Sequence, residues 1–165
     1  MTGDADEFER HRPLVFRVAY GMLGSAADAE DVLQDTFVRW HGARPDTIRT
    51  PSAWLVKVAT NLCLNRLTSA RARHEHYPGP WLPEPVLTGD GTLGPLESAE
   101  QREFVSLAFL VLLERLTPAE RAVFVLREAF GYRHDEVAEA LAVSAANSRQ
   151  LYRRARRQVA AAREA

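Results

Sequence analysis

The sequence predicts an all-α protein made of two helical modules joined by a linker rich in proline and glycine. Apolar residues recur at the three- and four-residue spacing of amphipathic helices, and no stretch shows the alternation of a half-buried strand. From His74 to Pro95, five prolines and four glycines interrupt this pattern. The predicted organisation is a front module over residues 1–75, a linker over 76–95 and a rear module over 96–165.

Three helices are predicted in the front module. The first covers about residues 6–23 and stops at Gly24, and the second begins behind Ser25 and runs to about residue 41. The third begins at Thr50-Pro51, a cap followed by proline at the first helical position, and continues to about residue 73. The stripes expected to face the core are Phe8, Val15, Val18, Ala19 and Met22 on the first helix, and Ala29, Val32, Leu33, Phe37 and Trp40 on the second.

Four helices are predicted in the rear module. One covers about residues 97–115, and the sequence from Thr117 to Glu120 forms a capping box that starts the next, which ends at Gly131. Two more follow, over about residues 134–141 and 145–161, separated by a three-residue turn. A tight turn between two helices is the arrangement of a helix-turn-helix.

The composition is that of a soluble globular protein, with 46% hydrophobic and 26% charged residues. No apolar run approaches the roughly 20 residues of a membrane helix, and the acidic N-terminus does not resemble a signal peptide. The single cysteine, Cys63, excludes an internal disulfide, suits a reducing compartment and is expected to be buried. We expect a cytoplasmic protein without membrane contact.

The formal net charge of −1 conceals an uneven distribution along the chain. Residues 1–37 carry eight acids and three bases, and residues 38–76 carry seven bases and two acids. Between Ala140 and Arg163 there are six arginines and no acid. Alternating blocks of this kind predict two surfaces that face DNA and at least one acidic surface for another partner.

The last predicted helix has the character of a DNA-recognition helix. Ser148, Leu151, Ala155 and Val159 form its inward stripe, and the opposite side collects arginines and amides, which bind phosphates and base edges. The alternative is a solvated basic face on an ordinary helical hairpin. The residues expected to bind duplex DNA are Ser144, Asn147, Arg149, Gln150, Arg153, Arg154, Arg156 and Arg157.

In the front module, the sequence DAEDVLQDTF (residues 28–37) resembles region two of bacterial extracytoplasmic-function sigma factors. In that family this helix docks on the coiled coil of the polymerase β′ subunit. An acidic, hydrogen-bonding face suits a basic partner helix, although a solvated acidic face is the alternative. The residues that the resemblance assigns to polymerase binding are Asp28, Asp31, Gln34, Asp35 and Phe37.

The following sequence, AWLVKVATNLCLNR (residues 53–66), is similar to the family's helix that opens promoter DNA at the −10 element. The loop before it, here about residues 41–51, captures a flipped base in the family. Trp54 is either a core residue or a DNA contact. The residues assigned to the −10 site are Arg44, Arg49, Thr50, Trp54, Lys57, Asn61, Asn65 and Arg66.

In the rear module, YRHDEVAEAL (residues 132–141) and the helix after it resemble region four, which reads the −35 element. The sequences ANSRQL (146–151) and WLPEP (81–85) are most similar to the sigma-J-type subgroup, whose members carry a C-terminal SnoaL-like domain. The resemblance implies a sigma factor that binds core RNA polymerase, through the β′ coiled coil and the β subunit, and directs transcription initiation at promoter DNA. It also raises an anti-sigma factor as a possible partner.

Two other functions remain open from the residues alone. The first is a helix-turn-helix regulator that is not a polymerase subunit, and the second is an interaction module without a DNA role. We expect no enzyme, because no nucleophile, base and orienting group occur together. We also expect no cofactor, because GDGTLG (89–94) lacks a strand and a βαβ unit, and no metal at His74-Glu75-His76.

Overall fold

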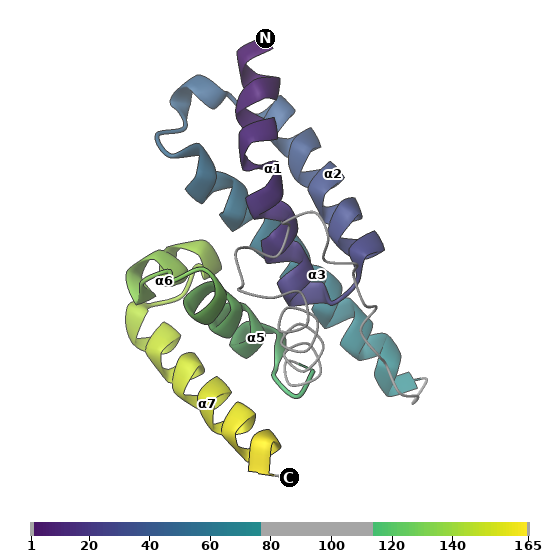
Figure 1. Ribbon diagram of the computed structural model, residues 1–165, viewed down its shortest axis with the longest axis vertical. Helices are drawn as coiled ribbons and strands as arrows, with labels where there is room; N and C mark the ends of the chain where they lie inside the picture. The colour runs from purple at the N-terminus through teal and green to yellow at the C-terminus, as the bar shows by residue number, and fades with distance from the viewer. Residues whose placement is uncertain (1, 77–113, 165) are drawn as a thin grey trace, which may run out of the picture.

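The computed structural model describes residues 2–76 and 114–164, and within these ranges every regular element is helical (Figure 1), which confirms the all-α prediction. None of the helices in these ranges combines the length and the apolar character needed to cross a bilayer. Apart from His76, the predicted linker lies outside the described residues, as does most of the predicted helix over 97–115. The elements are α1 (Thr2–Leu23), α2 (Ala26–Gly42), η1 (Pro45–Thr47), α3 (Pro51–His76), α5 (Pro118–Phe124), η2 (Val125–Ala129), α6 (His134–Leu141) and α7 (Ala145–Glu164).

The turn between α1 and α2 forms through local capping, as the sequence predicts. Gly24 has a φ of 71°, and its N–H donates to the carbonyl of Tyr20 at 2.8 Å, which closes α1. The Ser25 hydroxyl then accepts the N–H of Asp28 at 3.2 Å and caps α2. The predicted stripes on both helices are buried except for Phe37, which is 38% exposed.

The helices α1, α2 and α3 pack on one another as a three-helix bundle (Figure 1). Trp40 is buried in this bundle, and its indole Nε1 donates to the carbonyl of Asp4 at 2.8 Å. This bond ties the first turn of α1 to the end of α2, and α1 accordingly begins four residues before the predicted start. At the other end of the bundle, α3 continues three residues beyond the predicted end.

In the rear part, the capping box starts α5 as predicted. The Thr117 hydroxyl accepts the N–H of Glu120 at 3.2 Å, and the Glu120 carboxylate accepts the N–H of Thr117 at 3.0 Å. The helix predicted to continue to Gly131 instead changes into the π-helical turn η2. Gly131, with a φ of 67°, then turns the chain toward α6.

The predicted helix-turn-helix is confirmed in its helices and its turn. The helix α6 has the predicted bounds, and Ala142 ends it in the left-handed region with a φ of 55°. The helix α7 begins at Ala145 as predicted and continues three residues beyond the predicted end.

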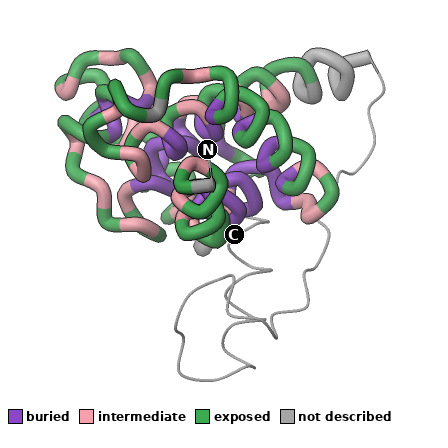
Figure 2. Tube along the Cα trace, turned by 90° about the horizontal axis from the view of Figure 1, so that it is seen from above, coloured by how far each residue is buried: buried purple, intermediate pink, exposed green. Residues whose placement is uncertain are grey.

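The two groups of helices share one hydrophobic core. The helix α3 packs against both α5 and α6, and α1 contacts η2. The guanidinium of Arg17 on α1 lies 5.9 Å from the ring centre of Phe130. Buried residues gather where the helices meet (Figure 2), so the predicted modules are in direct contact in this structure.

Candidate nucleic-acid interface

The helix α7 turns a stripe of small and apolar residues toward the core and a basic face toward solvent. Ser148 and Ala155 have no exposed surface, and Leu151 and Val159 are half-buried. This is the predicted inward stripe. The opposite face, also as predicted, carries the exposed residues Asn147, Arg149, Gln150, Arg153, Arg154, Arg156 and Arg157.

Ser144 caps the first turn of α7. Its hydroxyl accepts the N–H of Asn147 at 3.0 Å, and the residue is exposed. The cap satisfies one of the backbone N–H groups that an isolated helix start leaves unpaired. Ser144 therefore has a structural role in addition to the DNA contact expected from the sequence.

Beneath the basic face lies a polar and aromatic cluster that the sequence analysis did not identify. The Nδ1 atom of His134, at the start of α6, lies 2.8 Å from the hydroxyl oxygen of Ser148. The ring of Tyr152, one turn further along α7, meets the His134 ring edge-on at 5.5 Å, and its hydroxyl donates to Glu128. The sequence pattern that could have indicated this cluster is the serine at position 148 in an otherwise apolar stripe, because a buried hydroxyl requires a hydrogen-bond partner.

Cations surround this cluster. The guanidinium groups of Arg127 and Arg156 lie 5.1 and 5.8 Å from the ring centre of Tyr152. Burial, followed by the charges of Arg127 and Arg149, lowers the pKa of His134 and favours its neutral form. The hydrogen bond to its carboxylate partner raises the pKa of Tyr152.

On the front bundle, three predicted DNA-binding residues form an exposed line along α3. Lys57, Asn61 and Asn65 follow one another at four-residue intervals, and each is exposed. Trp54 is half-buried, and its ring meets the ring of Trp40 at 5.6 Å and 61°, so it belongs partly to the core. The exposed residues Arg44, Arg49 and Thr50 lie in the segment between α2 and α3.

Arg66 differs from the other predicted −10 residues because its side chain pairs with acids of α2. Its guanidinium nitrogens lie 3.7 Å from a carboxylate oxygen of Asp28, 3.6 Å from one of Asp31 and 3.8 Å from one of Asp35. All four side chains are at least one-third exposed, so these ion pairs are weak individually. The structure therefore joins a residue predicted to bind DNA to three acids predicted to bind polymerase.

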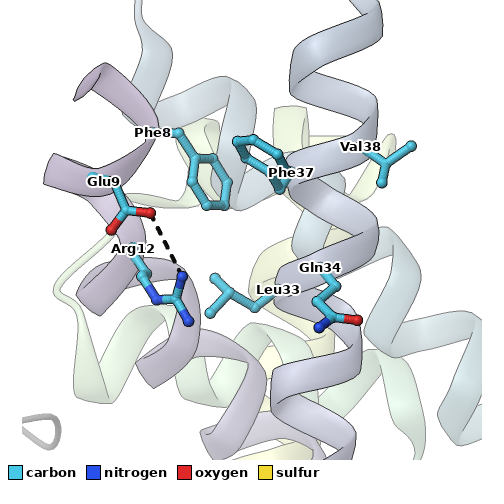
Figure 3. Close-up of a pocket in the computed structure, with 7 residues that line it drawn as sticks. All are labelled: Phe8, Glu9, Arg12, Leu33, Gln34, Phe37 and Val38. Atoms are coloured by element: carbon cyan, nitrogen blue, oxygen red, sulfur yellow. Dashed lines mark ion pairs between the residues drawn. The ribbon is translucent and has the colours of Figure 1, made fainter. Parts of the chain in front are cut away.

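An apolar groove lies between α1 and α2, the helix that carries these acids (Figure 3). The rings of Phe8 and Phe37 line it and contact each other edge-to-face, with their centres 4.9 Å apart. Gln34 also lines the groove, whose volume is about 360 Å³. Val38 lies at its edge and is 67% exposed, which the sequence analysis did not anticipate. A polar rim around exposed apolar side chains is typical of a protein-binding surface.

Cys63 is buried as predicted, and burial raises the pKa of its thiol to about 12. Arg121 of α5 is also buried and lies close enough for its charge to act on this thiol. Burial lowers the pKa of Arg121 to about 10. Among the described side chains, no three metal-ligating residues gather at one place, and the segment 89–94 lies outside the described residues.

The chain matches two sigma-70 family models, "Sigma-70 region 2" over residues 8–73 and "Sigma-70, region 4" over residues 106–159. It belongs to the sigma-70 family, within the extracytoplasmic-function group. Both family assignments expected from the sequence are thereby confirmed, the first for the front bundle and the second for the part that contains the helix-turn-helix.

Individual relatives agree with this assignment. The chain is 45% identical over 159 residues to the ECF RNA polymerase sigma factor SigJ of Mycobacterium tuberculosis. The aligned residues make up 96% of this chain and 50% of that protein. It is 36% identical over 155 residues to the probable ECF sigma factor SigI of the same species, with 90% and 51% coverage. The chain thus spans about half the length of these relatives.

Solved structures share the fold. The crystal structure of Mycobacterium tuberculosis SigJ has a TM-score of 0.71 and 42% sequence identity, over 94% of this chain and 52% of that chain. The sigma factor RpoE of Bartonella quintana, solved with the anti-sigma factor NepR, also has a TM-score of 0.71, over 96% and 95% of the two chains. At 17% identity, the second likeness is one of fold alone.

Proposed function

We propose that this chain acts as an alternative sigma factor, which binds core RNA polymerase and directs it to promoters of a particular sequence. The observation that carries this proposal is the basic, solvent-facing side of α7, held in place by the turn from α6. A helix of this kind enters the major groove of duplex DNA, where arginine and amide side chains reach base edges.

The proposed −35 reader is the N-terminal half of α7. Asn147, Arg149, Gln150 and Arg153 lie toward the helix start and reach bases, whereas Arg154, Arg156 and Arg157 neutralise phosphates. Support comes from their shared exposure on one face and from the absence of acids in this part of the sequence. Ser144 acts both as the helix cap and as a phosphate contact.

The proposed −10 site combines the line of Lys57, Asn61 and Asn65 with the segment before α3. A cation and two amides on one face of a helix suit a displaced single strand, because they bind its backbone and the edges of unstacked bases. Arg44, Arg49 and Thr50 receive the flipped base, with Trp54 beside them. Arg66 is the weakest member of this set, because its contacts are with acids.

The proposed polymerase-binding surface is the exposed face of α2. It places the acids Asp28, Asp31 and Asp35 next to the groove formed with Phe37, with Gln34 between the two. The acids attract a basic partner helix, and the groove offers apolar area that such a helix can cover. Val38, at 67% exposure, extends the apolar part of this surface.

In this proposal the protein works in the cytoplasm and catalyses no reaction of its own. Its modules are residues 1–75 for polymerase binding and −10 opening, and 96–165 for −35 reading, with 76–95 as the linker. An anti-sigma factor is a further proposed partner, because a structural neighbour was solved with one. In a longer protein, a SnoaL-like domain after this chain would be a regulator within the same molecule.

The decisive experiment is transcription in vitro with core polymerase and a library of randomised promoters. The wild-type chain should enrich a bipartite promoter, and the double variant Arg149→Ala, Arg153→Ala should lose enrichment at the upstream element. Arg10→Ala is the matched control, because this exposed arginine of α1 lies outside both proposed DNA surfaces. Without any enrichment by the wild type, the proposed function would be wrong.

A further inference from the structure

The recognition helix α7 is held to the rest of the helix-turn-helix by polar contacts as well as apolar packing. Ser148 is fully buried, and its hydroxyl oxygen lies 2.8 Å from Nδ1 of His134. The next turn repeats the arrangement, since Tyr152 packs on the His134 ring and donates to Glu128. Thus two successive turns of α7 contact the start of α6 and η2 through polar side chains.

The position of Ser148 makes a hydroxyl there informative. The other members of its stripe are Leu151, Ala155 and Val159, all without hydrogen-bonding groups in their side chains. An apolar residue at 148 would fill the same space without requiring a partner. A hydrogen bond differs from apolar packing because it depends on direction as well as distance, and therefore restrains the rotation of a helix about its own axis.

Rotation of α7 matters for what its outer face can reach. Arg149 directly follows Ser148, and Asn147 directly precedes it, so both proposed base readers are set by the orientation of this turn. On a helix with a radius of about 6 Å, a rotation of about 10° moves the outer side chains by about 1 Å. Bidentate contacts between a side chain and a base edge tolerate little more than that.

We propose that His134 and Ser148 form a latch that fixes the orientation of α7 and thereby determines the selectivity of this protein for its −35 sequence. Both are positioning residues, and neither touches a base. This inference rests on the proposed function of α7 as the −35 reader. It assigns selectivity to two side chains on the inner side of the helix-turn-helix.

The test compares binding of the full chain to two DNA duplexes at one fixed salt concentration. One duplex contains an upstream element selected by the wild-type chain from a randomised library, and the other has an unrelated sequence. For Ser148→Ala, we expect the ratio of the two affinities to fall by about tenfold. Binding to the unrelated duplex and its salt dependence should stay unchanged, because the arginines remain in place.

Variants of His134, the hydrogen-bond partner of Ser148, test whether the position of the bonding atom matters. In His134→Asn, the side-chain amide occupies the place of Nδ1, so this variant should retain most of the selectivity. In His134→Gln, the amide lies where Nε2 was, so selectivity should fall as in Ser148→Ala. The double variant His134→Gln, Ser148→Ala should be no worse than either single variant, because both remove the same contact.

The possible outcomes separate the latch from the underlying function. An unchanged affinity ratio in Ser148→Ala, with a loss in Arg149→Ala, would overturn the latch alone. Equal losses on both duplexes, or equal behaviour of His134→Asn and His134→Gln, would reduce the contact to a purely structural one and also overturn it. A wild-type chain without sequence preference, and an Arg149→Ala variant without effect, would overturn the proposed function together with the latch.

Discussion

Gly21 of α1 lies directly against Val125 of η2, so that a Cβ atom at position 21 would be 3.1 Å from one methyl carbon of Val125. This close approach joins the segment that matches sigma region 2 to the segment that matches region 4. The absence of a side chain at position 21 permits it, because ordinary Cβ contacts are longer. A substitution at position 21 therefore tests the packing between the two segments.

Gly21→Val should destabilise the protein by about 1–3 kcal/mol, because the added methyl groups overpack the contact with Val125. Gly42→Val is the matched control, since a Cβ at the end of α2 would meet no atom within 4 Å. Urea unfolding followed by circular dichroism measures both variants. Equal loss of stability in the two variants would contradict the close approach of Gly21 to Val125.

A disulfide between positions 21 and 125 should prevent promoter-dependent transcription. In Cys63→Ser carrying Gly21→Cys and Val125→Cys, the new side chains lie within disulfide reach. Contact of α3 with α5 and α6 keeps the two proposed DNA sites close, whereas two turns of duplex span roughly 70 Å.

We expect the oxidised form to bind an isolated upstream duplex but not to support transcription, and reduction should restore activity. Cys63→Ser alone serves as the control for loss of the natural thiol. Full transcription by the oxidised form would show that the two segments need not separate.

The buried thiol of Cys63 should make stability fall at alkaline pH. Burial raises its pKa to about 12, from 9.0 in an exposed thiol, so the folded state keeps a proton that the unfolded state releases. The contribution of the Cys63 thiol to the free energy of unfolding is fully present below about pH 9. Above that pH it declines by at most about 1.4 kcal/mol per pH unit.

The measurement is the difference in unfolding free energy between the wild type and Cys63→Ala at several pH values. The comparison is made below about pH 10, because the lowered pKa of Arg121, about 10, makes its own contribution act in the opposite direction above that pH. A difference that stays constant from neutral pH to about pH 10 would contradict the burial of the thiol in solution.

Replacing Arg66 should distinguish the DNA contact predicted for this residue from the polymerase binding predicted for the acids that it pairs with on α2. In Arg66→Gln, three carboxylates lose their shared cation, so the face of α2 becomes more negative. If these acids bind a basic helix of polymerase, we expect tighter binding of core enzyme at low salt and a steeper salt dependence.

Two variants serve as references for this prediction. Asp31→Asn with Asp35→Asn should weaken polymerase binding, and Arg10→Gln should leave it unchanged, because Arg10 pairs with Glu7 on α1. Should Arg66→Gln weaken binding as much as the aspartate variants, Arg66 would itself be a polymerase contact or a support of the fold.

The sequence predicted those features that depend on neighbours within one helical turn. The caps at Ser25, Thr117 and Ser144 each involve a residue three positions further along the chain, so the pattern of residues alone reveals them. The buried stripes of α1 and α7 were predictable for a related reason, because helical periodicity shows which side of a helix avoids water.

Contacts between helices were not predictable in this way. Periodicity indicates which face of a helix is buried, but it does not indicate which other helix covers that face. The pairing of Arg66 with the acids of α2 and of His134 with Ser148 therefore emerged only from the structure. Phe37 is the reverse case, since its place in an apolar stripe predicted burial, yet it lines an open groove.

The edge-to-face pair of Trp40 and Trp54 offers an optical consequence. Trp40 is buried and hydrogen-bonded, whereas Trp54 is half-buried beside the segment proposed to receive an unstacked base. Because the two rings lie 5.6 Å apart and are crossed at 61°, we expect their near-ultraviolet circular dichroism to depend on their mutual orientation. If Trp54 receives an unstacked base as proposed, stacking would disturb this signal and give a label-free optical readout of strand opening.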